Sequence, residues 1–216
     1  MQINCCLGRK LRSIAVQLPE MLNVENSTQK AAADCCDLIG IPRNISSLSK
    51  ERIRRAGKKI KEENAEKEGV ENLDTGFRVF KLDSSNIQEW RPKREDIAET
   101  LEEHAEHVKE DRSEQDILFE LLLKLGLDLC IPIEEREVAG KTVYNIGAGT
   151  LLVCLAKEVK ASEVEELALG LVAWCKELDA GETQCVFRDS AYADNNAKSN
   201  LTAILNQNGL QNVRSL

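Results

Sequence analysis

The stretch from Ser113 to Leu125 constrains the fold of this chain most, because its apolar residues cover nearly the whole circumference of a helix. These residues are Ile117, Leu118, Phe119, Leu121, Leu122, Leu123 and Leu125. Ser113 and Asp116 form a capping box of the looser Ser-x-x-Asp type, and Gly126 ends the helix. A helix that is apolar on most sides is buried on most sides, so we expect it inside a folded domain.

The chain after this helix predicts a compact mixed α/β domain over residues 111–216. The three strands that follow are separated by turns short enough for an antiparallel meander; they are Cys130 to Val138, Lys141 to Ile146 and Thr150 to Leu155. A helix capped by Ser162 and Glu165 comes next, then a strand from Gln184 to Arg188 and a helix that begins at Asp194. Val213 is a candidate for the start of a last strand.

Residues 1–110 are more charged, and their predicted strands have no evident sheet partners nearby. The predicted elements are a strand at Ile14 to Leu18, helices at Thr28 to Leu38 and Lys50 to Glu68, a strand at Phe77 to Leu82 and a helix at Arg94 to Lys109. Ser49 is the expected N-cap of the second helix. We expect residues 1 to about 70 to be poorly ordered or to self-associate, because unpaired strands expose their edges.

A basic run within the Lys50 to Glu68 helix is the candidate contact with DNA phosphates. Its residues are Arg52, Arg54, Arg55, Lys58 and Lys59. Such contacts are electrostatic and do not read sequence. The alternative is a solvated helix face balanced by the acidic residues that follow. The net charge of −8 argues against a surface devoted to nucleic acid throughout.

The chain predicts a cytoplasmic protein without a membrane span or a metal site. No apolar stretch approaches the length of a membrane helix, and the N-terminus does not resemble a secretory signal. The eight cysteines, expected to be reduced, form no Cys-x-x-Cys pair. His104 and His107 could share a metal ion, but a surface helix is the favoured interpretation. Asp189 and Asp194 are interpreted as a turn residue and an N-cap.

Several longer strings resemble the modification subunit of type III restriction systems, which is a DNA adenine methyltransferase. These strings are Lys50 to Gly57, Asp74 to Asn86, Asp116 to Leu129, Val186 to Ser190, and Lys198 with Asn200. The likeness runs from about Ile14 to Leu216 and implies the remnant of a Rossmann-like methyltransferase sheet in residues 1–110, ahead of the C-terminal domain.

Two motifs of that family are absent, so no catalytic residue is predicted. The methyltransferase needs an Asp/Asn/Ser-Pro-Pro-aromatic turn for the flipped base, but no two prolines of this chain are adjacent. It also needs a glycine-rich turn between a strand and a helix for the cofactor. Gly147-Ala148-Gly149 lies between two predicted strands, where a hairpin turn is favoured. A truncated gene, a split reading frame or a deliberately shortened chain would each explain these absences.

The resemblance implies S-adenosylmethionine as the cofactor of the whole enzyme, with no tight binding expected of this part alone. By strand order, Gln17 and Glu20 would face the ribose of the cofactor, and Asp83 would lie toward its adenine. The implied partners are DNA, another modification subunit and the restriction subunit. Three roles stay open: a methyltransferase part that is inactive alone, a non-enzymatic module for assembly or dimerisation, and a nonspecific nucleic-acid binder.

Overall fold

The computed structural model describes residues 13–89, 106–192 and 194–216. The chain forms two compact units, Met1–Phe80 and Lys81–Leu216. The sequence places the division near residue 110 instead. The segment after Lys81 belongs to the second unit because polar contacts fix it to the first helix there: Ser85 Oγ and the Asn86 backbone N–H donate to the two carboxylate oxygens of Glu120, at 2.6 and 2.7 Å.

The unit Lys81–Leu216 contains a mixed five-stranded sheet in the order β1-β2-β3-β4-β5. Its strands are β1 (Ile133–Val138), β2 (Lys141–Ile146), β3 (Leu151–Cys154), β4 (Gln184–Phe187) and β5 (Asn212–Ser215). The first three pair antiparallel, and β3, β4 and β5 pair in parallel. The predicted meander, the β4 strand and the last strand at Val213 are confirmed.

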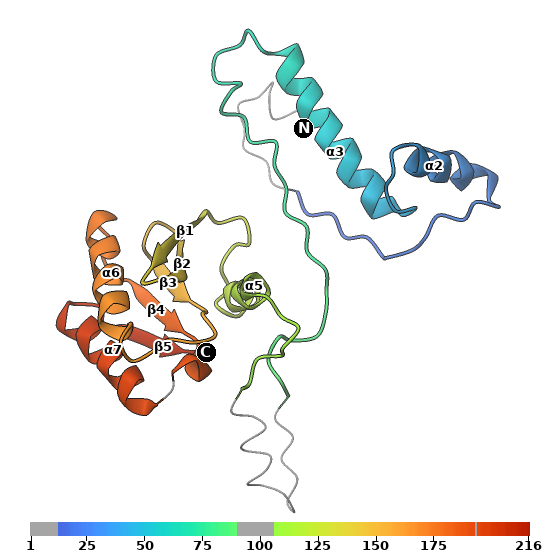
Figure 1. Ribbon diagram of the computed structural model, residues 1–216. Helices are drawn as coiled ribbons and strands as arrows, with labels where there is room; N and C mark the ends of the chain where they lie inside the picture. Colours follow the sequence, from blue (N-terminus) through green and yellow to red (C-terminus); the bar gives the residue numbers. More distant parts are fainter. Residues whose placement is uncertain (1–12, 90–105, 193) are drawn as a thin grey trace, which may run out of the picture. The chain divides into compact units, whose positions relative to one another are not determined.

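Helices cover both faces of this sheet, as Figure 1 shows. The helices α6 (Val164–Glu177) and α7 (Asn195–Gln207) pack on one face, against side chains such as Leu152 and Phe187. The helix α5 (Glu114–Lys124) packs on the other face, against Val153 and Val186. Strand side chains alternate between the two faces, so consecutive residues of β3 enter different cores.

The N-termini of the helices in this unit show which of the predicted caps form. Ser113 and Asp116 form the predicted capping box at α5, and Asp194 accepts a hydrogen bond from the Ala197 N–H at the start of α7. The cap predicted at Ser162 is wrong. Glu163 occupies the N-cap position of α6, and it makes no hydrogen bond from its side chain to the helix.

The unit Met1–Phe80 contains two described helices, α2 (Ser27–Leu38) and α3 (Ile45–Glu63). The α2 helix agrees with the sequence. The predicted start of α3 is wrong, because Asn44 and not Ser49 is its N-cap and accepts from the Ser47 N–H. Ala33, Cys36 and Ile60 are the buried apolar side chains among the described residues of this unit, so its core is small.

The two strands predicted for the first part of the chain are wrong as secondary structure. Residues 13–20 and 73–83 are extended but pair with no strand. Among the described residues before 110, β pairing is limited to single bridges, Met21 with Asn44 and Ile87 with Val108. The missing sheet partners are the physical reason, since a strand needs neighbours to satisfy its backbone. These residues therefore form no Rossmann-like sheet, and the described structure does not confirm such a remnant.

The helix predicted at Arg94 to Lys109 lies mostly outside the described residues. Residues 106–109 are described and are not helical. They run beside an earlier segment, where the Gln88 N–H donates to the carbonyl of His107 at 2.7 Å and the Lys109 N–H donates to the carbonyl of Asn86 at 2.9 Å.

Gly170 permits the close approach of α6 to β1. A Cβ atom at this position would lie 2.3 Å from Cγ1 of Val138, which is itself buried. Any larger residue must therefore displace the helix, the strand or the Val138 side chain.

We expect Gly170→Ala to lower the free energy of unfolding by about 1–3 kcal/mol, because overpacking outweighs the helix propensity gained from alanine. Urea titration of the full chain measures this change. Gly181→Ala is the matched control: a Cβ there meets nothing within 4 Å. Val138→Ala removes the obstructing methyl groups, so the double variant should be more stable than the sum of the single changes predicts. Strict additivity would contradict this account.

Candidate functional site

Polar side chains gather where the parallel strands β3, β4 and β5 end. Phe187, the last residue of β4, pairs with Cys154 of β3 and with Ser215 of β5. Open α/β sheets often bind ligands beyond the carboxyl ends of their strands, at the point where the strand order reverses. This sheet has a sequential order without such a reversal, so the case for a site depends on the side chains themselves.

Arg188, directly after β4, is the centre of this polar cluster. Its side chain is only 4% exposed, although it carries a full charge. Nη2 donates to Glu106 Oε1 at 2.6 Å, and Nε donates to Ser190 Oγ at 3.0 Å. The Ser190 hydroxyl in turn donates to Glu106 Oε1 at 3.2 Å, as does the Val108 backbone N–H. Three groups therefore converge on a single carboxylate.

The environment of Glu106 holds its carboxyl group in the charged form. Burial alone would raise its pKa, but the hydrogen bonds from Arg188, Val108 and Ser190 and the charge of Arg188 lower the pKa below its usual value. The Glu106 side chain remains 45% exposed. The Glu106 carboxylate thus lies between the buried Arg188 guanidinium and the solvent.

A second ion pair lies beside the first. Lys198 of α7 forms a short contact with Asp189, and its Nζ donates to Ser215 Oγ at 3.3 Å. The hydrogen bond from Lys198 lowers the pKa of the Asp189 carboxyl group. This pair ties the helix α7 to the ends of β4 and β5.

Two buried polar atoms near these pairs have no hydrogen-bond partner among the described residues: His107 Nε2 and the Tyr192 hydroxyl. The charge of His107 contributes to the lowered pKa of Asp189, so the two side chains are near each other. Burial raises the pKa of Tyr192 well above its usual value, which keeps this hydroxyl protonated.

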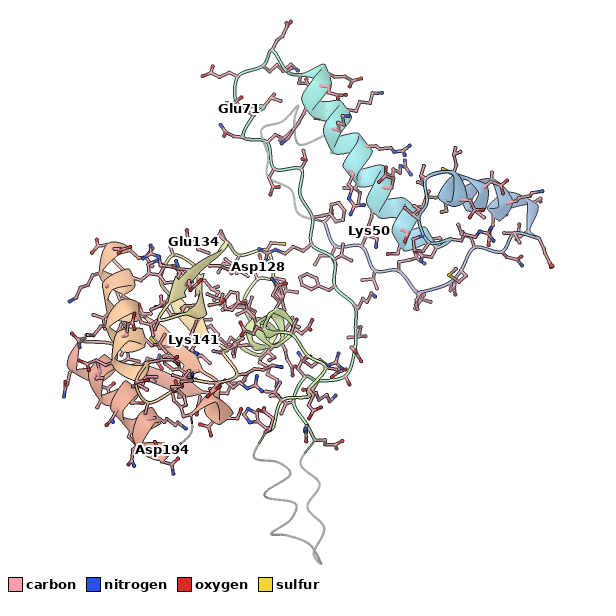
Figure 2. All side chains as sticks on the ribbon, viewed as in Figure 1. Lys50, Glu71, Asp128, Glu134, Lys141 and Asp194 are labelled. Atoms are coloured by element: carbon pink, nitrogen blue, oxygen red, sulfur yellow. The ribbon has the colours of Figure 1, made fainter. Side chains whose placement is uncertain are left out.

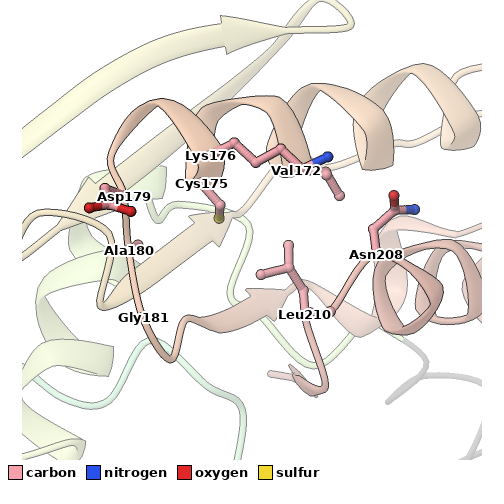
Figure 3. Close-up of a pocket in the computed structure, with 9 residues that line it drawn as sticks. Val172, Cys175, Lys176, Asp179, Ala180, Gly181, Asn208 and Leu210 are labelled. Carbon is pink, nitrogen blue, oxygen red and sulfur yellow. The ribbon is translucent and has the colours of Figure 1, made fainter.

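Two small hollows among the described residues lie at opposite ends of the parallel strands. One, of about 80 Å³, lies between α7 and β5 and includes Tyr192, Lys198 and Ser215 in its wall. The other, of about 290 Å³, lies where α6 and α7 end, with Val172, Cys175 and Leu210 among its apolar side chains (Figure 3). The first could admit a water molecule, and the second could admit a small organic group.

The three residues predicted to bind the cofactor belong to different units of the chain. Gln17 and Glu20 are exposed on the extended segment of residues 13–20. Asp83 belongs to the other unit and accepts from Arg112 Nη1 at 2.9 Å, which lowers the pKa of its carboxyl group. The strand ends expected to present these residues to a cofactor are not formed among the described residues.

The basic residues predicted to contact DNA lie on α3, whose side chains are drawn in Figure 2 with Lys50 near its start. Arg55 Nε pairs with Glu51 at 2.7 Å, and Lys58 and Lys59 pair with Glu62 and Glu63 one turn later. Arg54 and Arg52 are also exposed, and the guanidinium of Arg54 lies over the ring of Phe77. Exposed pairs of this kind are weak. The geometry thus fits the solvated face and still leaves these cations accessible to phosphates.

The described residues contain no group of three or more His, Cys, Asp or Glu side chains that could hold a metal ion. Cys35, Cys36, Cys130, Cys154, Cys175 and Cys185 are free thiols. Burial raises the pKa of Cys154 to about 11, as expected for a core thiol. His104 lies outside the described residues. No described helix is both long and apolar enough to cross a membrane.

Sequence reasoning found the Asp194 cap but missed the polar cluster. It interpreted Asp189 as a turn residue, and it did not connect that residue with Glu106 or Lys198. The arginine directly after an apolar strand was the available signal, because a charge in that position needs a partner when it is buried. Comparison with models of protein families, with curated proteins and with solved structures finds no match to this chain.

We expect the hydrogen bonds that Glu120 accepts from Ser85 and Asn86 to make the stability of the folded unit sensitive to acid. Burial alone would raise its pKa, but hydrogen bonds from Ser85, Asn86 and Lys124 lower the pKa from 4.5 to about 2. A carboxyl group whose pKa is lowered by folding stabilises the native state above its unfolded pKa, and this stabilisation disappears as the pH falls towards its folded pKa. The effect amounts to at most about 3 kcal/mol, since one unit is about 1.4 kcal/mol.

Urea titration between pH 6 and pH 2 tests this expectation with Glu120→Gln. The variant should be less stable than the wild type at pH 6, and the difference should shrink as the pH falls through about 4.5 towards about 2. Glu182→Gln is the matched control on an exposed glutamate of the same unit. A difference that stays constant with pH would show that Glu120 acts through packing and not through its charge.

Proposed function

We propose that this chain is the C-terminal part of a site-specific DNA adenine-N6 methyltransferase of a type III restriction-modification system, and that it does not catalyse methyl transfer alone. The resemblance of its sequence strings to that family motivates the proposal. The chain lacks the paired prolines and the glycine-rich cofactor turn of such an enzyme. Its role in catalysis therefore depends on polypeptide that carries those motifs.

The observation that carries this proposal is the exposure of two segments with strand-like composition. Ile14 and Val16 are 94% and 91% exposed, and Val79 and Leu82 are 53% and 104% exposed. Valine, isoleucine and phenylalanine in extended backbone are typical of strands inside a sheet, where elements packed on the faces of the sheet cover them. A sheet completed by the rest of a methyltransferase would bury these side chains.

The same proposal assigns the cofactor and the partners to the completed enzyme. S-adenosylmethionine would bind where the completed sheet presents Gln17, Glu20 and Asp83, and this chain alone would bind it weakly. DNA would be a partner of the whole enzyme, with the basic face of α3 as a contact with phosphates.

A second candidate is a module for assembly with another modification subunit or with the restriction subunit. The unit Lys81–Leu216 favours this role, because it has a core on each face of its sheet without any of the catalytic motifs above. Such a unit can fold and bind a partner without carrying out chemistry. Sedimentation showing only monomer at high concentration would argue against self-association.

Co-expression with a polypeptide carrying the Pro-Pro-aromatic and Phe-x-Gly-x-Gly motifs of such a methyltransferase tests the first proposal. Transfer of a radioactive methyl group from S-adenosylmethionine to adenine in duplex DNA should require both chains. Val79→Asp should reduce this activity by at least about tenfold, because a charge would be buried in the completed sheet.

Leu38→Asp is the matched control, because Leu38 is 86% exposed on α2 and outside both strand-like segments. It should leave the restored activity near the wild-type value. Amides of residues 14–18 and 77–82 should also become protected from hydrogen exchange when the two chains are mixed. Unchanged exchange together with no activity would contradict the proposal.

A further inference from the structure

We propose that the cluster around Arg188 is a binding site for a small phosphoryl anion, which Glu106 occupies in this structure. The inference concerns the unit Lys81–Leu216 and does not depend on the methyltransferase proposal. The ligand class includes inorganic phosphate and the terminal phosphate of an organic monoester.

The first argument is the number of donors that meet at one oxygen. Glu106 Oε1 accepts from Arg188 Nη2 at 2.6 Å, from Ser190 Oγ at 3.2 Å and from the Val108 N–H at 3.2 Å. A guanidinium, a hydroxyl and a backbone amide directed at one point are the groups that bind phosphoryl and carboxylate oxygens.

The second argument is the difference between the two sides of this ion pair. Arg188 is 4% exposed and is held by the sheet, where its N–H donates to the carbonyl of Cys154 at 3.3 Å. Glu106 is 45% exposed and belongs to a segment outside the strands. The Glu106 side chain can therefore turn towards solvent while Arg188 and Ser190 stay in place, and its departure would leave a buried cation that requires another anion.

The depth of the site selects the kind of anion. Because Arg188 is almost completely buried, the ligand must take the place beside it that the half-exposed Glu106 carboxylate fills. A phosphate with three unsubstituted oxygens can enter as that carboxylate does. The phosphodiester backbone of duplex DNA carries substituents on both sides and cannot reach the same depth.

Nearby residues complete the charge balance. Lys198 is already paired with Asp189, so this second pair contributes little net charge to the site. Replacement of Glu106 by a phosphoryl group would then match one buried guanidinium with one anion. Arg188 would meet this anion through Nη2, while its Nε keeps the hydrogen bond to Ser190 Oγ.

Glu106→Gln tests the proposal by removing the resident anion while keeping the shape of the side chain. Calorimetry of the full chain with inorganic phosphate, against chloride at equal ionic strength, should show at least about tenfold tighter binding to the variant than to the wild type. Ser190→Ala in the same background removes one donor and should weaken binding several-fold. Equal phosphate affinity in the wild type and Glu106→Gln would overturn the proposal.

A measurement on the wild type covers the case in which Glu106→Gln does not fold. The carboxyl carbon resonance of Glu106 should shift as phosphate is added at millimolar concentration and should not shift with chloride. A resonance that is insensitive to phosphate would overturn the proposal.

Competition separates the possible sources of the phosphoryl group. A nucleoside monophosphate that displaces phosphate would identify a monoester ligand, and failure to displace it would identify free phosphate; both support the site. Displacement by duplex DNA without terminal phosphates would overturn the assignment to a small anion.

Discussion

The burial of β3 on both faces is the constraint on which the unit Lys81–Leu216 depends. All four of its residues, Leu151 to Cys154, are at most 3% exposed. It pairs antiparallel with β2 and parallel with β4, so it joins the hairpin half of the sheet to the half that is connected through helices. Both α5 and α6 are needed to bury β3, because a strand whose consecutive residues are apolar must have an element packed on each face of the sheet.

This constraint also explains where the polar groups can lie. The strand interiors carry apolar side chains into both cores, so the charged residues of the strands lie at strand ends and on the two edge strands, β1 and β5. The chain turns away from the sheet at the end of β4, and Arg188 enters a place that is buried but next to backbone carbonyls. A cation there requires an anion, and Glu106 supplies it from a distant part of the sequence.

The sequence correctly predicted those elements whose apolar side chains are covered by other parts of the same unit. The capped helix α5, the strand at Lys141 to Ile146 and the cap at Asp194 are local patterns, and the structure confirms each of them, although Leu123 on α5 is exposed. The same reasoning failed for Ile14 to Leu18 and for Phe77 to Leu82, because strand composition specifies a surface that must be covered and cannot specify what covers it. The cluster around Arg188 could not be predicted either, since Glu106 is separated from it by 82 positions.

Stability alone does not account for the pair of Arg188 and Glu106. Desolvation of a guanidinium and a carboxylate costs several kcal/mol per ion, and replacing such pairs by packed apolar residues is often neutral or stabilising. An apolar residue at position 188 would continue the pattern of β4 and would extend the core that contains Val186. The chain instead keeps a buried cation, surrounds it with a hydroxyl and an amide, and closes it with a side chain that half faces solvent. As a purely structural ion pair this arrangement costs desolvation free energy, whereas it is well suited to the exchange of one anion for another.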